Sequence, residues 1–118
     1  METLNQGFNL TISVNNFHLS YDDVGEGSTP IICLHGYPFD KTMWQGQLDF
    51  LKSSNRIIAC DIRGFGKSSK PYSAYDYDIF ASDLHAVLKK LNLKNVTLGG
   101  FSMGGAVAIH YVAKYGNE

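Results

Sequence analysis

The residues most able to do chemistry lie in the segment 99–105, whose letters GGFSMGG match the pattern Gly-x-Ser-x-Gly. The pattern stands between a short apolar run and a stretch of helical periodicity, the context of a strand-to-helix turn that exposes a serine as a nucleophile. Such a turn strains the backbone of Ser102, so Gly100 and Gly104 are expected to remove side chains that would collide there. Gly105 is expected to let the helix pack close to the sheet. A simpler interpretation is a glycine-rich turn whose serine only caps the helix.

The chemistry that an exposed serine could do here is acyl transfer. Its hydroxyl would attack a carbonyl carbon, and backbone amides forming an oxyanion hole would hold the charge on the oxygen. The amide of Met103, at the start of the predicted helix, is one expected donor. The segment His35-Gly36-Tyr37-Pro38 follows an earlier apolar run. In folds that use such a turn, this loop supplies the second donor, which assigns that role to the Tyr37 amide. Gly36 would allow a tight departure from the strand, and Pro38 would stiffen the loop.

A serine nucleophile also needs a base and an acid that orients the base. After Ser102 the sequence offers one histidine, His110, and one acid, Glu118. His110 lies further along the same predicted helix, about 12 Å away at roughly 1.5 Å per residue, and Glu118 is twice as far in sequence. Neither can join a triad with Ser102. His35 is the local alternative if its strand lies beside the strand that leads to the serine, about 4.8 Å away. No carboxylate is obviously placed to orient it.

A third glycine-rich segment, residues 61–68, follows another apolar run. Its Gly-Lys-Ser ending resembles a phosphate-binding loop, but that motif needs a glycine where Asp61 stands. The dinucleotide-binding pattern fails as well, because Ser69 holds its third glycine position. We therefore interpret the segment as a charged turn in which Asp61 and Arg63 fix the loop beneath the site.

These motifs need a scaffold, and the hydropathy pattern predicts one. Residues 8–14 and 17–24 alternate between apolar and polar around Asn15-Asn16, which predicts an antiparallel hairpin with one face in water. Three continuous apolar runs then alternate with three amphipathic segments, as in a mostly parallel sheet with helices on both faces. The fold class is therefore α/β, a hairpin followed by βαβαβα. The predicted strands cover residues 31–34, 57–60 and 96–98, and the predicted helices lie within residues 40–51, 80–91 and 102–115.

Composition narrows the class of protein. The chain has 118 residues, enough for a single domain over 1–118, with 44% hydrophobic residues and a formal net charge of −1. That charge balance provides no basic surface for nucleic acid, and no apolar run approaches the roughly 20 residues that cross a bilayer. The first residues lack the features of a signal peptide, and Cys33 and Cys60 resemble buried reduced thiols. A cytoplasmic protein without nucleic-acid or membrane partners is expected.

Taken together, the motifs resemble the α/β-hydrolase superfamily. They are the hairpin, His35-Gly36-Tyr37-Pro38, Asp61-x-Arg63-Gly64-x-Gly66-x-Ser68 and Gly100-x-Ser102-x-Gly104, in that order over the chain. The residues that follow Pro38 make small serine esterases and cofactor-free haloperoxidases the most similar members. Epoxide hydrolases and haloalkane dehalogenases share parts of the pattern but use an aspartate where Ser102 stands. The resemblance implies a serine hydrolase that acts on carboxylic esters or related small acyl substrates through an acyl-enzyme on Ser102. It implies no metal and no organic cofactor, and it makes His35 a loop-structuring residue.

The resemblance covers only the N-terminal half of such an enzyme. Members are typically more than twice this long, and their triad acid and histidine follow the serine. The chain therefore looks truncated, and by itself it is expected to be inactive or very weak. In the family's sheet the strand before the serine is central, whereas here residues 95–99 would form an open edge that recruits another strand. Three hypotheses stay open: a serine hydrolase, a non-catalytic fragment that self-associates or is completed by a C-terminal segment through that edge, and a ligand-binding relative.

Overall fold

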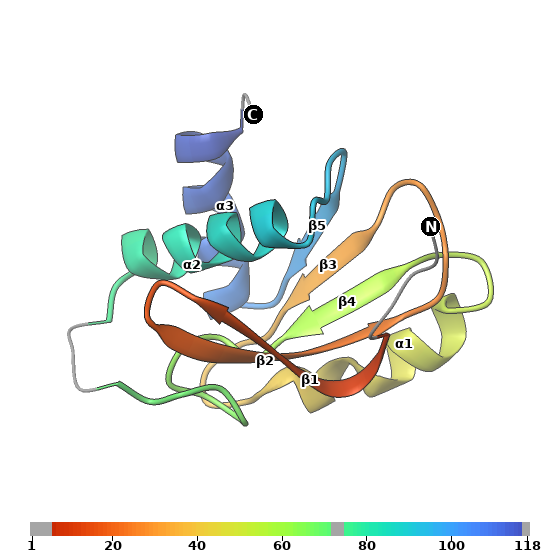
Figure 1. Cartoon of the computed structure of the whole chain (residues 1–118), viewed down its shortest axis with the longest axis horizontal. Coiled ribbons are helices and arrows are strands. Elements are labelled where there is room, and N and C mark those ends of the chain that lie inside the picture. Colours follow the sequence, from red (N-terminus) through yellow and green to blue (C-terminus); the bar gives the residue numbers. More distant parts are fainter. Residues whose placement is uncertain (1–5, 72–74, 117–118) are drawn as a thin grey trace.

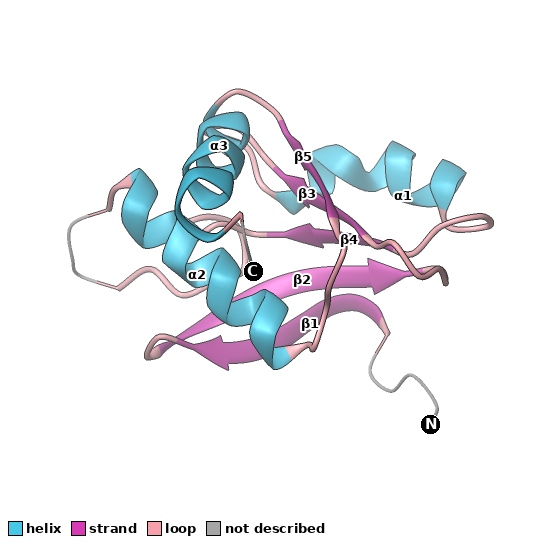
Figure 2. Ribbon diagram, turned by 90° about the horizontal axis from the view of Figure 1, so that it is seen from above, coloured by secondary structure: helices cyan, strands magenta, loops and turns pink. Residues whose placement is uncertain are grey.

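The computed structural model describes residues 6–71 and 75–116 as one five-stranded sheet between two helical layers (Figures 1 and 2). The strand order is β1-β2-β4-β3-β5. Strand β2 is antiparallel to both of its neighbours, β1 and β4, whereas β4, β3 and β5 are mutually parallel. This arrangement confirms the predicted α/β class and the hairpin that precedes it. The strands are β1 (Gly7–Val14), β2 (Phe17–Val24), β3 (Ile31–Leu34), β4 (Ile57–Cys60) and β5 (Thr97–Gly100). The helices are the 3₁₀ helix η1 (Lys41–Trp44), α1 (Gln45–Leu51), α2 (Tyr77–Lys90) and α3 (Met103–Tyr115).

The hairpin forms where the alternation predicts it. Asn15 and Asn16 join β1 to β2 with φ of 48° and 66°, the left-handed pair that a two-residue turn requires and that asparagine tolerates. The predicted wet face is wrong for β2, because Ser20 and Asp22 are only 3% exposed. Asp22 lies opposite Ala59 of β4, and Ala59 faces η1 and α1. The outer face of β2 is therefore covered by protein.

Two apolar clusters lie on opposite faces of the sheet. The larger is packed beneath α2 and α3, and the smaller, built around Leu48 and Ile57, is packed beneath α1. Figure 1 shows the same division, with α1 on one side of the sheet and α2 and α3 on the other. Cys33 and Cys60 belong to different clusters and are free thiols, as predicted. Burial raises the pKa of Cys33 to about 11 and that of Cys60 to about 12, so both thiols are inert.

Helix starts are set by aspartate caps. Asp40 accepts a hydrogen bond from the Thr42 amide at the start of η1. Asp76 accepts from the Ile79 amide at the start of α2, four residues before the start of the helix predicted over residues 80–91. Each cap satisfies a backbone donor that the helix itself cannot. No helix within 6–71 and 75–116 is long and apolar enough to cross a membrane.

Most side chains of β5 and α3 are partly or largely exposed to solvent. β5 pairs only with β3 among the strands of the described sheet, so its other side is an edge, as predicted. In α3 only Gly104 and Val107 are buried, whereas Ile109 is 71% and Val112 is 57% exposed. The serine turn therefore lies between the buried strand β3, on which β5 pairs, and the largely exposed helix α3.

Candidate active site

Ser102 stands at the turn between β5 and α3 in a strained conformation, with φ 56° and ψ −110°. A non-glycine residue in such a region costs on the order of 1–3 kcal/mol and is typical of functional sites. Its side chain makes no capping hydrogen bond to α3, and the residue is exposed. The structure therefore argues against a serine that only caps the helix, and it leaves the hydroxyl accessible to a reagent.

The glycines around the serine fulfil different needs. A Cβ on Gly100 would lie 2.5 Å from the amide nitrogen of Gly105, and a Cβ on Gly104 would overlap the carbonyl of Leu34 in β3. Both positions therefore need glycine for close approach of backbone to backbone. A Cβ on Gly105 would lie 3.5 Å from the Gly100 carbonyl oxygen, an ordinary contact. The expectation that Gly105 allows close packing is wrong, because it is Gly104 that lies against the sheet.

The loop after β3 lies directly against the serine turn. Phe101 donates its amide to the Leu34 carbonyl at 3.1 Å, which continues the β3–β5 pairing. A Cβ on Gly36 would come within 2.8 Å of the Phe101 ring and 3.0 Å of its carbonyl oxygen. Gly36 is thus needed for contact between the two loops, and its φ is not in the left-handed region.

Two backbone amides flank this contact without a partner. Met103 is the first residue of α3, so its amide has no acceptor within the helix. The amide of Tyr37, which precedes Pro38 in the loop after β3, makes no hydrogen bond to the residues that the structure describes. These are the two amides that the sequence proposes as donors to an oxyanion. The loops that carry them meet at Gly36 and Phe101.

His35 is fully buried and both of its ring nitrogens are engaged. The Ile62 amide donates to Nε2 at 2.9 Å, so the ring proton is on Nδ1, which donates to the Gly36 carbonyl oxygen at 3.0 Å. Burial lowers the pKa of His35, so the ring is neutral. A ring held in this way has no free lone pair to accept a proton from Ser102. The geometry opposes His35 as a base and agrees with a loop-structuring role.

The other three histidines are engaged elsewhere. His18 contacts the hydroxyl of Ser13 at 2.9 Å on the hairpin. His85 is stacked on Tyr115 at 4.0 Å between ring centroids, and His110 lies 3.4 Å from the Asp78 carboxylate. No histidine in the described part of the chain is oriented by an acid toward Ser102. Glu118 lies outside the described residues.

Asp61 is the centre of a buried polar cluster that sequence reasoning found only in part. Its carboxylate accepts from the Lys41 amide at 2.7 Å, the Lys41 ammonium at 3.0 Å and the Lys67 amide at 2.9 Å. Gly66 has φ 56°, and a Cβ there would overlap this carboxylate. The Lys67 amide lies in the segment whose Gly-Lys-Ser ending resembles a phosphate-binding loop, and here it donates to the Asp61 carboxylate. Lys41 was missed because a lysine beside a helix start is ordinarily exposed, and no local signal marks its partner twenty residues away.

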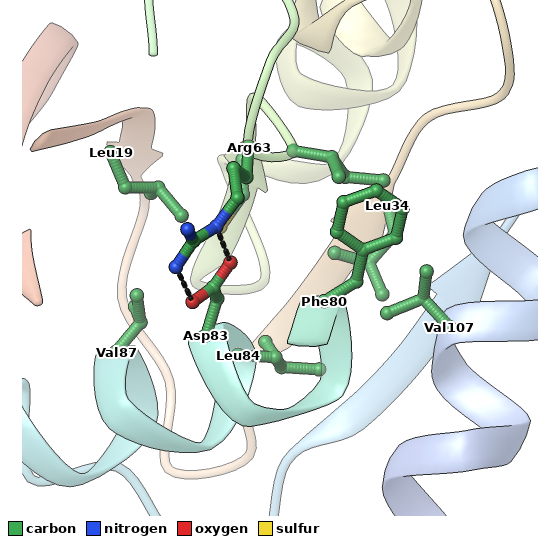
Figure 3. A pocket seen from close by; sticks show the side chains of 10 residues that line it. Leu19, Leu34, Arg63, Phe80, Asp83, Leu84, Val87 and Val107 are labelled. Carbon is green, nitrogen blue, oxygen red and sulfur yellow. Dashed lines mark hydrogen bonds and ion pairs between the residues drawn. The ribbon is translucent and has the colours of Figure 1, made fainter. Parts of the chain in front are cut away.

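Arg63 fixes the same loop by a different contact. Its guanidinium donates two hydrogen bonds to Asp83 of α2, at 2.8 and 2.7 Å, and lies 4.3 Å from the centre of the Phe17 ring. The hydrogen bond to Asp83 raises the pKa of Arg63. Figure 3 shows this pair at a small, largely apolar pocket of about 20 Å³ beneath α2. Ser102 does not line that pocket, and the contacts of Arg63 hold the loop after β4 against α2.

No group of three or more histidine, cysteine, aspartate or glutamate side chains within 6–71 and 75–116 could hold a metal ion. Among the described residues, the turn brings together one strained serine and two amides without a hydrogen-bond partner, beside loops fixed by buried ion pairs and hydrogen bonds.

Comparison with known proteins gives consistent results. A family model described as alpha/beta hydrolase fold matches residues 29–118. A putative non-heme chloroperoxidase from Synechocystis sp. is 48% identical over 99 residues, which cover 83% of this chain and 36% of that protein. The crystal structure of a bromoperoxidase from Bacillus anthracis has a TM-score of 0.81 at 46% identity, over 85% of this chain and 36% of that one. A thermophilic esterase from Thermogutta terrifontis has a TM-score of 0.80 at 36% identity, over 89% and 39%. The chain thus spans little more than a third of the length of these relatives.

Proposed function

The chain belongs to the alpha/beta hydrolase family, and from that premise we propose that it is the serine-bearing part of an esterase that forms an acyl-enzyme on Ser102. The observation that carries the proposal is the conformation of Ser102, strained at φ 56° and free of any capping hydrogen bond. Such strain persists only where the surrounding structure enforces it, and here the close approach of Gly100 and Gly104 does so.

The proposed reaction begins with attack of the Ser102 hydroxyl oxygen on the carbonyl carbon of an ester. In the proposed step the amides of Tyr37 and Met103 donate hydrogen bonds to the oxygen that becomes negative, and such donors lower the barrier by stabilising the developing charge. The tetrahedral intermediate expels the alcohol and leaves an acyl group on Ser102, which water then removes. The base and its orienting acid come from outside the residues described here, because all four histidines are engaged elsewhere.

The surroundings of the turn favour neutral, apolar acyl groups. Tyr37, Phe39 and Phe101 are 69%, 51% and 49% exposed, and the rings of Phe39 and Phe101 lie 6.4 Å apart. Exposed aromatic side chains gathered in one place indicate a binding surface for apolar groups. Hydrogen bonding from Thr42 lowers the pKa of Asp40, which therefore stays anionic and disfavours a negatively charged substrate. The similarity to a thermophilic esterase supports an ester as the substrate.

A second candidate function follows from the open side of the fold. β5 is an edge strand of the described sheet, and Ile109 and Val112 of α3 are largely exposed. Such an edge pairs readily with another chain. The candidate is a non-catalytic fragment that self-associates through β5, or is completed there by a C-terminal segment. Sedimentation that is independent of concentration would rule out self-association.

The experiment that tests the proposed function treats the chain with 4-nitrophenyl acetate and records its intact mass. One acetyl group on the peptide that contains Ser102 is the expected result, formed slowly because no base is in place. The Ser102→Ala variant should not be labelled, whereas Ser53→Ala, which removes an exposed serine far from the turn in sequence, should be labelled like the unchanged chain. Equal labelling of Ser102→Ala would overturn the proposal.

A further inference from the structure

We propose that the buried pair of Lys41 and Asp61 is a positioning clamp that sets the place of the Tyr37 amide. Residues 36–40 form an arch that we name the Tyr37 arch, and the clamp holds its far end. The inference rests on the proposed function, because it concerns an amide assigned there to the oxyanion. It adds a positioning residue, Lys41, that touches neither the substrate nor Ser102.

The two ends of the Tyr37 arch are fastened to two consecutive residues of the loop after β4. At the near end, His35 accepts a hydrogen bond from the Ile62 amide at 2.9 Å. At the far end, the Lys41 amide donates to the Asp61 carboxylate at 2.7 Å. The span of the arch is therefore fixed by one short piece of backbone, so a shift of Asp61 would move the arch with it.

Lys41 extends the clamp to a third segment. Its side chain is only 2% exposed, and its ammonium donates to Asp61 at 3.0 Å and to the Asn9 side chain of β1 at 2.8 Å. Asn9 itself has φ 55° at the irregular start of the hairpin. A buried carboxylate and ammonium must be paired, so each partner holds the other in place. The carboxylate also accepts from the Lys67 amide, which leaves it little freedom to turn.

Between its ends the Tyr37 arch packs on Phe101 through Gly36 and Phe39, and its outer side chains are exposed. Tyr37 is 69% exposed and Phe39 is 51% exposed. Inside the arch the Phe39 amide donates to the Gly36 carbonyl at 2.8 Å. The centroids of the Tyr37 and Phe65 rings lie 5.7 Å apart in an edge-to-face arrangement, and Phe65 belongs to the loop that carries Asp61. The position of the Tyr37 amide thus depends on that loop at both ends and in the middle.

The variant Lys41→Met removes the ammonium while keeping a side chain of similar length. It leaves Asp61 buried without its charged partner, so the fold itself is at risk. The double variant Lys41→Met with Asp61→Asn removes both charges and avoids an unpaired anion. Lys67→Met is the matched control, because it removes an exposed ammonium from the same loop and keeps the backbone amide that Asp61 accepts from.

The test uses n-butylboronic acid, which forms a tetrahedral adduct on a serine hydroxyl and places an oxygen anion where the oxyanion of the reaction would be. The expected result is a boron-11 signal of the tetrahedral adduct in the unchanged chain, absent in Ser102→Ala. In the unchanged chain the adduct should shift the amide ¹⁵N–¹H signals of both Tyr37 and Met103. In the clamp variants the shift at Tyr37 should be lost and that at Met103 kept, with affinity lower by about tenfold.

The outcomes separate the two proposals. Absence of a tetrahedral adduct in the unchanged chain would overturn the proposed function and the clamp with it. An adduct whose Tyr37 shift and affinity are unchanged in the clamp variants would overturn the clamp alone. Equal loss of the Tyr37 and Met103 shifts would show general destabilisation, which also overturns it. Unfolding of both clamp variants beside a folded Lys67→Met would show that the pair supports the whole fold and does not position the arch.

Discussion

The loops after β3 and β4 differ sharply from the β5–α3 unit that they meet. In the loops, charged and polar side chains are buried and fully engaged, as Asp61 and His35 show. In the β5–α3 unit, apolar side chains such as Ile109 are exposed, and only one large side chain of α3, that of Val107, is buried. Apolar side chains are usually buried and charged ones exposed, and both of these adjacent regions show the reverse.

The difference shows how a reactive turn is supported from one side. Ser102 belongs to the open unit, yet what enforces its conformation is contact with β3 and the loop that follows it, where Gly104 lies against Leu34 and Gly36 lies against Phe101. The buried side chains of His35 and Asp61 are hydrogen-bonded to neighbouring segments, which makes the two loops rigid. The turn can therefore be ordered even though the far side of α3 contributes little to its stability.

The largest expected effect is at the contact between the two regions. Gly104→Ala should destabilise the fold by about 3 kcal/mol, because its Cβ would overlap the backbone of β3, which cannot move aside. The matched variant Gly105→Ala should be stabilising by up to about 1 kcal/mol, since alanine favours helix more than glycine does. Urea unfolding measures both. Similar losses in the two variants would contradict the assignment of the contact to Gly104.

A smaller effect should separate the two faces of α3. Val107 is 1% exposed, and Val107→Ala should cost about 2 kcal/mol through lost burial and a cavity. Ile109 is 71% exposed, and Ile109→Ala should change stability by less than about 0.5 kcal/mol. Thermal unfolding of the pair gives the comparison. A loss at Ile109 as large as that at Val107 would mean that the outer face of α3 is covered in solution.

The smallest effect concerns pH. Burial lowers the pKa of His35 below its ordinary value of 6.5, so between these two values the unfolded chain binds a proton that the folded chain does not. Stability should therefore fall as the pH drops below about 6.5, by at most about 1.4 kcal/mol per pH unit. Unfolding in urea at pH 7 and pH 5 measures the slope, which His35→Asn should reduce. A slope that stays the same in His35→Asn would contradict the account.

How much the sequence predicts differs between the same two regions. The turn at Ser102 and its need for Gly100 arise from sterics within a few residues, so the pattern predicts them, whereas the contact that requires Gly104 is made with Leu34 of β3. The succession of strands and helices along the chain, and the mostly parallel sheet, follow from the apolar runs and from the rules of parallel connection. The burial of Lys41 against Asp61 and the covered outer face of β2 at Ser20 depend on segments far apart in the chain. No local pattern records such a pairing, which forms only when the loops fold over the sheet.

The most direct test of the central claim is reaction of the purified chain with a fluorophosphonate probe, followed by intact mass and peptide mapping. The claim is that β3 and the loop that follows it hold Ser102 in a reactive conformation even though no histidine within the described residues serves as its base. The account predicts a single, slowly formed adduct on Ser102, absent in Ser102→Ala and retained in His110→Asn. An adduct on another residue, or no adduct on a folded chain, would contradict it.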